Sequence, residues 1–149
     1  LSSGGSYTSV GTYDHSELVH LVTALSHRTG AAIPDLVKTF GLHLATVFEK
    51  KFPSFFEECD DCFSFYKRID DHIHVEVQKL YPDAELPKFS YDDSQPDSFQ
   101  LTYESTRQFA DLAVGLLEGV AKHYDETINI DKQDLSTEAV TKVVFTITK

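Results

Sequence analysis

The sequence predicts an α+β fold, built as one domain with two lobes, and two observations carry this prediction. In the first half of the 149 residues, apolar side chains recur at spacings of three and four, the period of an α-helix. Beyond Pro87 the apolar residues alternate, most clearly over residues 140–148, as in a half-buried strand. We therefore expect a helical N-terminal half followed by the order strand–strand–helix–strand–strand.

The first two helices have clear start and stop signals. Asp14 is a favoured N-cap, Glu17 is spaced to complete a capping box, and Gly30 ends the first helix. The second helix begins at Pro34, a favoured first-turn residue, and ends at Pro53.

A third helix is expected over residues 70–81, closed by Pro82. The dense aromatic stretch that precedes it, residues 55–66, must be buried in a core or against a large apolar ligand. In the second half the patterns predict strands over 88–91 and 99–103, a strong helix over 107–124, and strands over 127–131 and 140–148.

Composition excludes several classes of function. Thirteen basic and 24 acidic residues give a net charge of −11, which repels nucleic acid and anionic membrane surfaces. No apolar run approaches the ~20 residues that span a bilayer, and the opening residues 1–7 do not resemble a signal peptide. Sparse cysteine favours a cytoplasmic location. Neither a nucleophile elbow nor a glycine-rich phosphate loop is present, so hydrolase and kinase functions are disfavoured.

The two cysteines support an alternative function. Cys59 and Cys62 have the spacing of a redox pair or of half a zinc site, which would make the protein a thiol or zinc switch. A zinc site needs four ligands and no second cysteine pair exists, while Asp60 and Asp61 would raise the thiol pKa values. We therefore favour two unrelated thiols near a helix start.

Of the seven histidines, His72 and His74 are the candidate metal ligands. Residues two apart on a helix point ~200° apart, so they cannot share one metal ion. His74 lies beside the apolar stripe of its helix, whereas His72 leans towards Asp71 and Glu76. From spacing alone, a lone histidine beside such a stripe is more often a core residue than a ligand.

Tyr103, Ser105 and Arg107 form the clearest candidate binding site. Along an extended strand the three side chains point to one side, just before a helix. Arg binds a carboxylate through two hydrogen bonds, and each hydroxyl can donate one more, so the cluster fits one or two carboxylates. The alternative is an ordinary polar strand end, although a positive charge at a helix start is unfavourable there.

These residues resemble a known family. The motif Tyr103-x-Ser105-x-Arg107 and the run GLLEG at residues 115–119 are similar to those of the haem nitric-oxide/oxygen binding (H-NOX) family. The resemblance covers nearly the whole chain and is greatest to the stand-alone bacterial sensors related to the haem domain of soluble guanylate cyclase. Three further features match in sequence or spacing: the His74 helix, residues 86–89 (LPKF) and residues 3–8 (SGGSYT).

The resemblance implies a fold and a cofactor. The fold is a helical N-terminal lobe and a C-terminal antiparallel sheet with a helix, with haem b between the lobes. His74 would be the proximal ligand of the iron, and Pro87 would press on the porphyrin. The two haem propionates would be held by Tyr103, Ser105 and Arg107.

The resemblance also points to the identity of the gas. Leu112 and Leu116 are expected to line the cofactor pocket, and Leu112 stands where oxygen-binding members carry a distal tyrosine. Bound oxygen needs a hydrogen-bond donor, whereas nitric oxide and carbon monoxide need little. We therefore expect nitric oxide and carbon monoxide to bind without a stable oxygen complex.

The implied function is a sensor and not an enzyme. Nitric oxide would bind the ferrous iron and weaken the bond to His74, whose helix would then signal to a separate protein. The usual partners in this family are sensor histidine kinases and cyclic-di-GMP enzymes. A haem peroxidase would need a distal acid–base pair, for which His43 is the only candidate.

One departure from the family pattern concerns the start of the chain. Members normally carry a helical segment, beginning with Met, before the glycine-rich opening. This chain starts at Leu1 and contains no Met. We therefore expect a single H-NOX domain over residues 1–149 that lacks this segment. A contact with a further chain would then cover the apolar surface that its absence leaves exposed on the domain.

Overall fold

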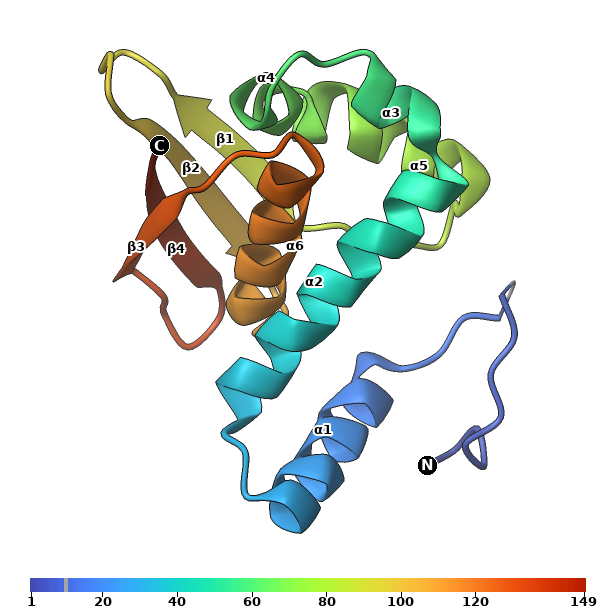
Figure 1. The fold of residues 1–149 in the computed structure, drawn as a ribbon. Coiled ribbons are helices and arrows are strands. Elements are labelled where there is room, and N and C mark those ends of the chain that lie inside the picture. Colours follow the sequence, from blue (N-terminus) through green and yellow to red (C-terminus); the bar gives the residue numbers. More distant parts are fainter. Residues whose placement is uncertain (10) are drawn as a thin grey trace.

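Helices form the first half of the molecule and a sheet with one long helix forms the second (Figure 1). The structure is a computed structural model that describes residues 1–9 and 11–149. The N-terminal elements are α1 (His15–Thr29), α2 (Ile33–Lys51), α3 (Pro53–Glu57), α4 (Cys62–Lys67), the π-helix η1 (Ile69–Ile73) and α5 (His74–Leu80). The C-terminal elements are β1 (Lys88–Asp92), β2 (Phe99–Ser105), α6 (Ala110–His123), β3 (Asn129–Asp134) and β4 (Thr141–Thr148). This order confirms the predicted α+β fold.

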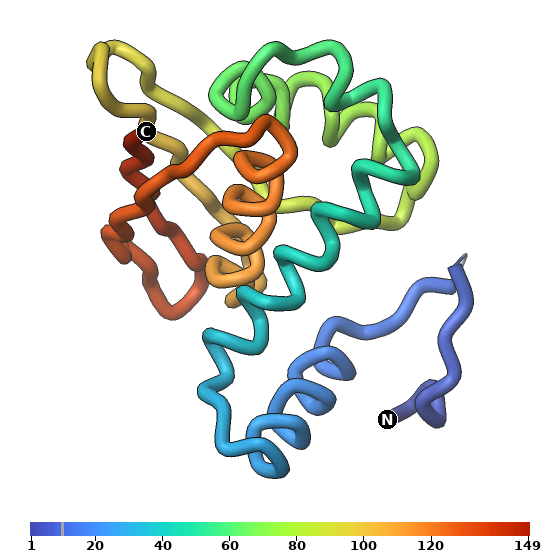
Figure 2. The backbone as a smooth tube through the Cα atoms, viewed as in Figure 1, coloured from blue at the N-terminus to red at the C-terminus, as the bar shows by residue number. Residues whose placement is uncertain are grey.

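The four strands make one antiparallel sheet in the order β1-β2-β4-β3. On β4 the residues Val143, Phe145 and Ile147 are buried, so the predicted alternation is confirmed. Phe145 pairs with Leu101 of β2 across the centre of the sheet. β1 pairs with β2 and forms one edge of the sheet, next to the segment that follows α5 (Figure 2).

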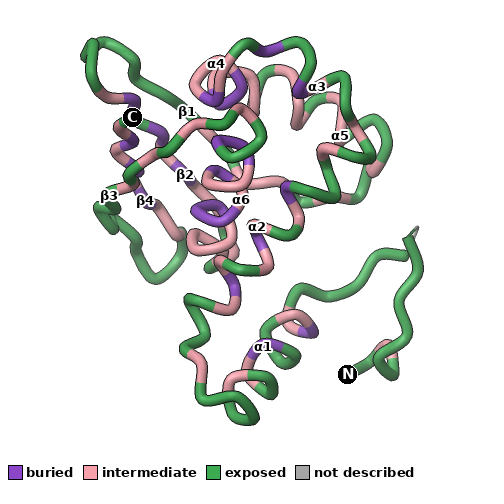
Figure 3. The backbone as a smooth tube through the Cα atoms, in the orientation of Figure 1, coloured by how far each residue is buried: buried purple, intermediate pink, exposed green. Residues whose placement is uncertain are grey.

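The core lies between the sheet, α6 and the short helices α3 and α4 (Figure 3). Much of the aromatic stretch expected to need burial is in this core: Phe56, Phe65 and Tyr66 are buried. The Tyr66 hydroxyl donates to the carbonyl oxygen of Leu117 on α6, 2.6 Å away. Burial raises the pKa of Tyr66 far above its usual value, so the phenol remains a neutral donor.

Helices α2 and α6 pack at close range because glycines face each other at their contact. A Cβ atom added at Gly115 would lie 2.9 Å from the Cα of Gly41, and it would also collide with the carbonyl oxygen of Lys38. Cβ atoms do not approach backbone atoms this closely, so only glycine fits at this crossing. The crossing places α6, which carries the predicted pocket residues, against α2.

Several expected elements differ from the structure at their ends. The helix expected over 70–81 is a π-helical turn over Ile69–Ile73 followed by α5. The helix expected over 107–124 begins at Ala110, so Arg107 lies in the preceding turn and not at a helix start. The strand expected over 127–131 covers Asn129–Asp134. None of the helices in the described part of the chain is long and apolar enough to cross a membrane.

The expected capping box at the start of α1 forms only in part. The Asp14 side chain accepts from the backbone N–H of Ser16 at 2.8 Å, as an N-cap does. The buried Glu17 carboxylate instead accepts from Ser2 Oγ at 2.5 Å, Ser3 N at 2.8 Å and Tyr7 Oη at 2.7 Å. Glu17 therefore attaches the N-terminal segment to α1.

This attachment should depend on pH. Hydrogen bonds from Ser2, Ser3 and Tyr7 favour the charged carboxylate and lower the pKa of Glu17 from 4.5 to about 2. A depressed folded-state pKa means that the contribution is present above pH 4.5 and is lost as the pH falls towards 2. We expect the NMR resonance of the Ser3 amide in the folded protein to titrate with a midpoint near pH 2, and Glu17→Gln to abolish the titration. A titration midpoint near pH 4.5, the ordinary value for a glutamate, would show that these hydrogen bonds do not lower the pKa of Glu17.

Candidate functional site

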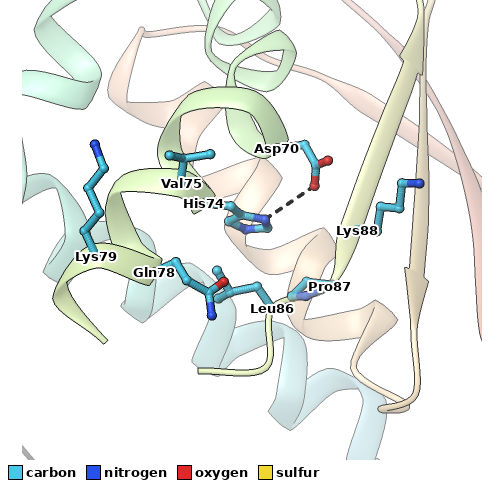
Figure 4. Close-up of a pocket in the computed structure, with 8 residues that line it drawn as sticks. All are labelled: Asp70, His74, Val75, Gln78, Lys79, Leu86, Pro87 and Lys88. Atoms are coloured by element: carbon cyan, nitrogen blue, oxygen red, sulfur yellow. Dashed lines mark ion pairs between the residues drawn. The ribbon is translucent and has the colours of Figure 1, made fainter. Parts of the chain in front are cut away.

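A cavity of about 500 Å³ lies between α5 and the segment that leads into β1 (Figure 4). Its lining combines an imidazole, a carboxylate, apolar side chains and two lysines. The residues are Asp70, His74, Val75, Gln78, Lys79, Leu86, Pro87 and Lys88. The cavity therefore brings together two of the predicted site residues, His74 and Pro87.

His74 is the first residue of α5 and is largely buried, with 18% of its side chain exposed. Its Nδ1 lies 3.7 Å from Oδ1 of Asp70, and its ring centroid is 5.7 Å from that of Phe89. Burial lowers the pKa of the His74 imidazole, which outweighs the opposing effect of Asp70. At neutral pH the imidazole is therefore uncharged, the form that binds a metal ion.

His72 points to a different part of the molecule, as the sequence argument expected. Its Nε2 lies 3.6 Å from Oε2 of Glu58, and 40% of its side chain is exposed. The ring stacks edge-on against Phe55 with centroids 6.0 Å apart. The expected neighbours Asp71 and Glu76 are not its ion-pair partners in this structure.

Tyr103, Ser105 and Arg107 are joined by hydrogen bonds at the end of β2. The buried Tyr103 hydroxyl donates to the carbonyl oxygen of Arg107 at 3.2 Å, and the Arg107 N–H donates to Ser105 Oγ at 3.0 Å. The Arg107 guanidinium pairs with the Glu85 carboxylate and contacts His15. The guanidinium is thus already a carboxylate-binding group, whereas the Tyr103 hydroxyl is used within the turn.

This motif is near the cavity but does not line it. Glu85, the partner of Arg107, lies two residues before Pro87, so the 85–88 segment connects the two groups. Leu112 and Leu116 are half-buried on α6 and are not among the lining residues of the His74 cavity. The structure therefore places the predicted residues in three neighbouring groups, on α5 with its following loop, at the end of β2, and on α6.

The chain also matches a family model. The model described as haem-NO-binding matches residues 1–132, most of the chain. The chain belongs to the haem-NO-binding (H-NOX) family. No curated protein matches it at a significant level.

Solved H-NOX structures are similar along the whole chain. The Fe(II) unliganded H-NOX protein from K. algicida is 36% identical with a TM-score of 0.92, and the match covers 100% of this chain and 80% of that one. The H-NOX from Shewanella woodyi, solved in the Fe(II)CO state with IWP-051 bound, is 42% identical with a TM-score of 0.83, over 100% and 78% of the two chains. A T. tengcongensis H-NOX mutant at 21% identity, with a TM-score of 0.87 over 97% and 79%, shows the shared fold. The α+β architecture described above is therefore the H-NOX fold.

The cysteines of this H-NOX domain are poorly suited to a thiol switch. Both are buried free thiols, and the backbone N–H of Cys62 donates to Oε2 of Glu126 at 2.8 Å. Burial, together with Glu126, raises the pKa of Cys62 to about 12, so its reactive thiolate is scarce at neutral pH. The raised pKa of Cys62 has the expected direction, but its causes are burial and Glu126 and not Asp60 or Asp61. Within residues 1–9 and 11–149 no group of three metal-binding side chains comes together, so no zinc site supports the alternative.

Three residues of this site were missed from the sequence: Asp70, Glu85 and His15. Asp70 could have been found, because it stands four residues before His74 on a helical pattern. His15 and Glu85 could not, since they are 92 and 22 residues from Arg107 along the chain. His43, the candidate for a peroxidase-like pair, is exposed on α2.

Proposed function

We propose that this H-NOX domain is a haem-based sensor that binds nitric oxide and carbon monoxide at ferrous iron and signals through a partner protein. The observation that carries the proposal is His74, an uncharged and largely buried imidazole in a cavity that also contains Pro87. A neutral, largely buried imidazole beside an apolar wall is suited to act as a proximal iron ligand.

The side chains present fit haem b. His74 would hold the iron, and the apolar Pro87, Leu112 and Leu116 would contact the porphyrin. Arg107 would bind a propionate, since its guanidinium already pairs with the Glu85 carboxylate. Ser105 accepts from the Arg107 N–H, which leaves its own hydroxyl proton to donate to a second carboxylate oxygen. When bound, haem supplies a ferrous iron with an open position for a diatomic gas.

The polarity of α6 sets the selectivity among gases. Leu112 and Leu116 are half-buried and carry no hydrogen-bond donor in their side chains. A bound oxygen molecule with partial negative charge would gain no stabilisation from these positions, whereas nitric oxide and carbon monoxide require none. This argument supports nitric oxide and carbon monoxide as ligands.

The proposed signal to the partner protein begins with a movement of α5. His74 begins this helix, so loss of its iron bond would free the helix to move relative to the sheet. The 85–88 segment and β1 follow directly, and they would carry the movement to the sheet edge. We propose that a separate bacterial protein in the cytoplasm, a sensor histidine kinase or a cyclic-di-GMP enzyme, reads this change. The net charge of −11 would suit a basic docking surface on that partner.

Absorption spectroscopy of the purified protein tests the proposal. We expect a Soret band that shifts when nitric oxide or carbon monoxide is added to the ferrous protein, and no stable oxygen complex in air. The Leu112→Tyr variant, which adds one phenol donor on α6, should gain an oxygen complex while still binding carbon monoxide. A wild-type oxygen complex that persists in air would refute the selectivity argument, and a protein that cannot be loaded with haem would refute the function.

A further inference from the structure

The ion pair between Glu85 and Arg107 uses the guanidinium that we assign to a haem propionate. Nη2 of Arg107 donates to Oε2 of Glu85, and Nη1 contacts the imidazole of His15. Both terminal nitrogens of the guanidinium therefore have partners within the chain. Arg107 carries one positive charge, and two carboxylates placed beside it would repel each other. A propionate and Glu85 are thus alternatives for the same group.

The arginine end of this pair is fixed by its own turn. The Tyr103 hydroxyl donates to the carbonyl oxygen of Arg107 at 3.2 Å, and the Arg107 N–H donates to Ser105 Oγ at 3.0 Å. The side chain of Arg107 is 27% exposed, against 70% for that of Glu85. When the pair opens, the glutamate can therefore move into water, whereas the guanidinium stays at the end of β2.

The glutamate end is carried by the loop that follows α5, and Gln78 lies beside that loop (Figure 4). Nε2 of Gln78 donates to the carbonyl oxygens of Pro82 at 3.2 Å and of Ala84 at 3.1 Å. Glu85 is the next residue along the chain. Because these two hydrogen bonds already restrict the loop, Glu85 reaches Arg107 at a smaller cost in conformational entropy.

We propose that Glu85 is an internal competitor of the haem propionates, which holds Arg107 until a propionate takes its place and thereby lowers the affinity of this domain for haem. The inference rests on the proposed function, because it takes Arg107 as a propionate-binding residue. One carboxylate replaces another at the guanidinium, and the displaced Glu85 is hydrated. Ion pairs between exposed side chains change an equilibrium constant by up to about five-fold, which sets the size of the expected effect.

The Glu85→Gln variant keeps the length of the side chain and removes the competing charge. When it is equilibrated with apomyoglobin and haem, we expect its share of the haem to rise about two- to five-fold in the partition ratio, relative to the wild type. The decisive comparison uses haem dimethyl ester, which carries no carboxylate. The wild type and Glu85→Gln should take up equal shares of this ester, because it does not compete for Arg107.

The matched control is Glu104→Gln, which removes one carboxylate from the same strand as Ser105. Glu104 pairs with Lys142 at 2.6 Å and not with Arg107. Both variants change the net charge by one, so the general repulsion of an anionic porphyrin falls by a similar amount in each. The partition ratio of Glu104→Gln should stay near the wild-type value. If it rises as much as that of Glu85→Gln, the effect comes from net charge and the inference fails.

A double substitution shows whether Glu85 acts through Arg107. In the Arg107→Gln background, Glu85→Gln should no longer change the haem partition ratio, so the two substitutions are not additive. A lower haem share in the single Glu85→Gln variant would mean that Glu85 positions the guanidinium, which would overturn the proposal. An equal gain with haem and with its dimethyl ester would overturn it too.

The outcomes also separate this inference from the proposed function. If the wild type takes up haem and Glu85→Gln has the wild-type partition ratio, only the competition by Glu85 is refuted. If the wild type takes up no haem, the proposed function fails and the inference fails with it.

Discussion

The His74→Gly variant is expected to lose the bond between protein and iron and to adopt the signalling state without any gas. His74 is the largely buried imidazole of the cavity, and glycine removes the whole ring while leaving space for free imidazole. We expect haem loss to be faster than in the wild type by at least the roughly 10–100-fold that loss of a ligand's hydrogen-bond partner costs. Added imidazole should restore the wild-type absorption spectrum but not the response of the partner protein, because the ligand is then no longer attached to α5.

The control for this variant is His72→Gly. It carries a similar backbone cost, about 1 kcal/mol for glycine in a helix. The His72 ring points to Glu58 and away from the cavity, so this variant should retain haem and the gas response. If His74→Gly regulated a partner as the wild type does, release of His74 would not be the trigger.

The Gly115→Ala variant is expected to lose stability because the α2–α6 crossing has no room for a methyl group. The new Cβ atom would meet backbone of α2 at Lys38 and Gly41, which cannot rotate away as a side chain can. Forced overpacking of this kind costs about 1–3 kcal/mol. Urea unfolding of both proteins measures the loss, and we expect the haem site to weaken too, since α6 would move away from α2.

Gly119→Ala is the matched comparison on the same helix. The methyl group added there would meet the Cβ of Ala45, a side-chain atom, and its nearest backbone atom would be the Leu42 carbonyl oxygen at 3.4 Å. Its destabilisation should therefore be smaller than that of Gly115→Ala. Equal stability of Gly115→Ala and the wild type would contradict the close contact between α2 and α6.

Much of the fold was predictable because its signals are local. The three- and four-residue spacing of apolar side chains defines α1, α2 and α6, and the alternation over 140–148 predicted the half-buried strand β4. The two short helices α3 and α4 were not predicted, because a run of aromatic residues has no clear period. The π-helical turn was missed for a similar reason, since nothing in residues 69–73 marks a change from the α-helical pattern.

In the candidate site, too, the features that depend on local geometry were predictable and the others were not. The opposite directions of His72 and His74 follow from helix geometry, and the neighbourhood of Tyr103, Ser105 and Arg107 follows from their places at the end of one strand. That the Tyr103 hydroxyl would be used by the turn itself did not follow, because the chain reverses direction after Ser105 in a way that strand geometry does not describe.

The class of the fold, the family resemblance and the choice of His74 over His72 all follow from residues close together in the chain, so they could be read before the structure was known. The partners of these residues follow from tertiary packing. The contacts of Arg107 with His15 and Glu85, of Asp70 with Phe89 and of Glu17 with Ser2 join segments 15 to 92 residues apart. Charged and polar side chains find such partners through the packing of whole helices and strands, and no local periodicity encodes that packing.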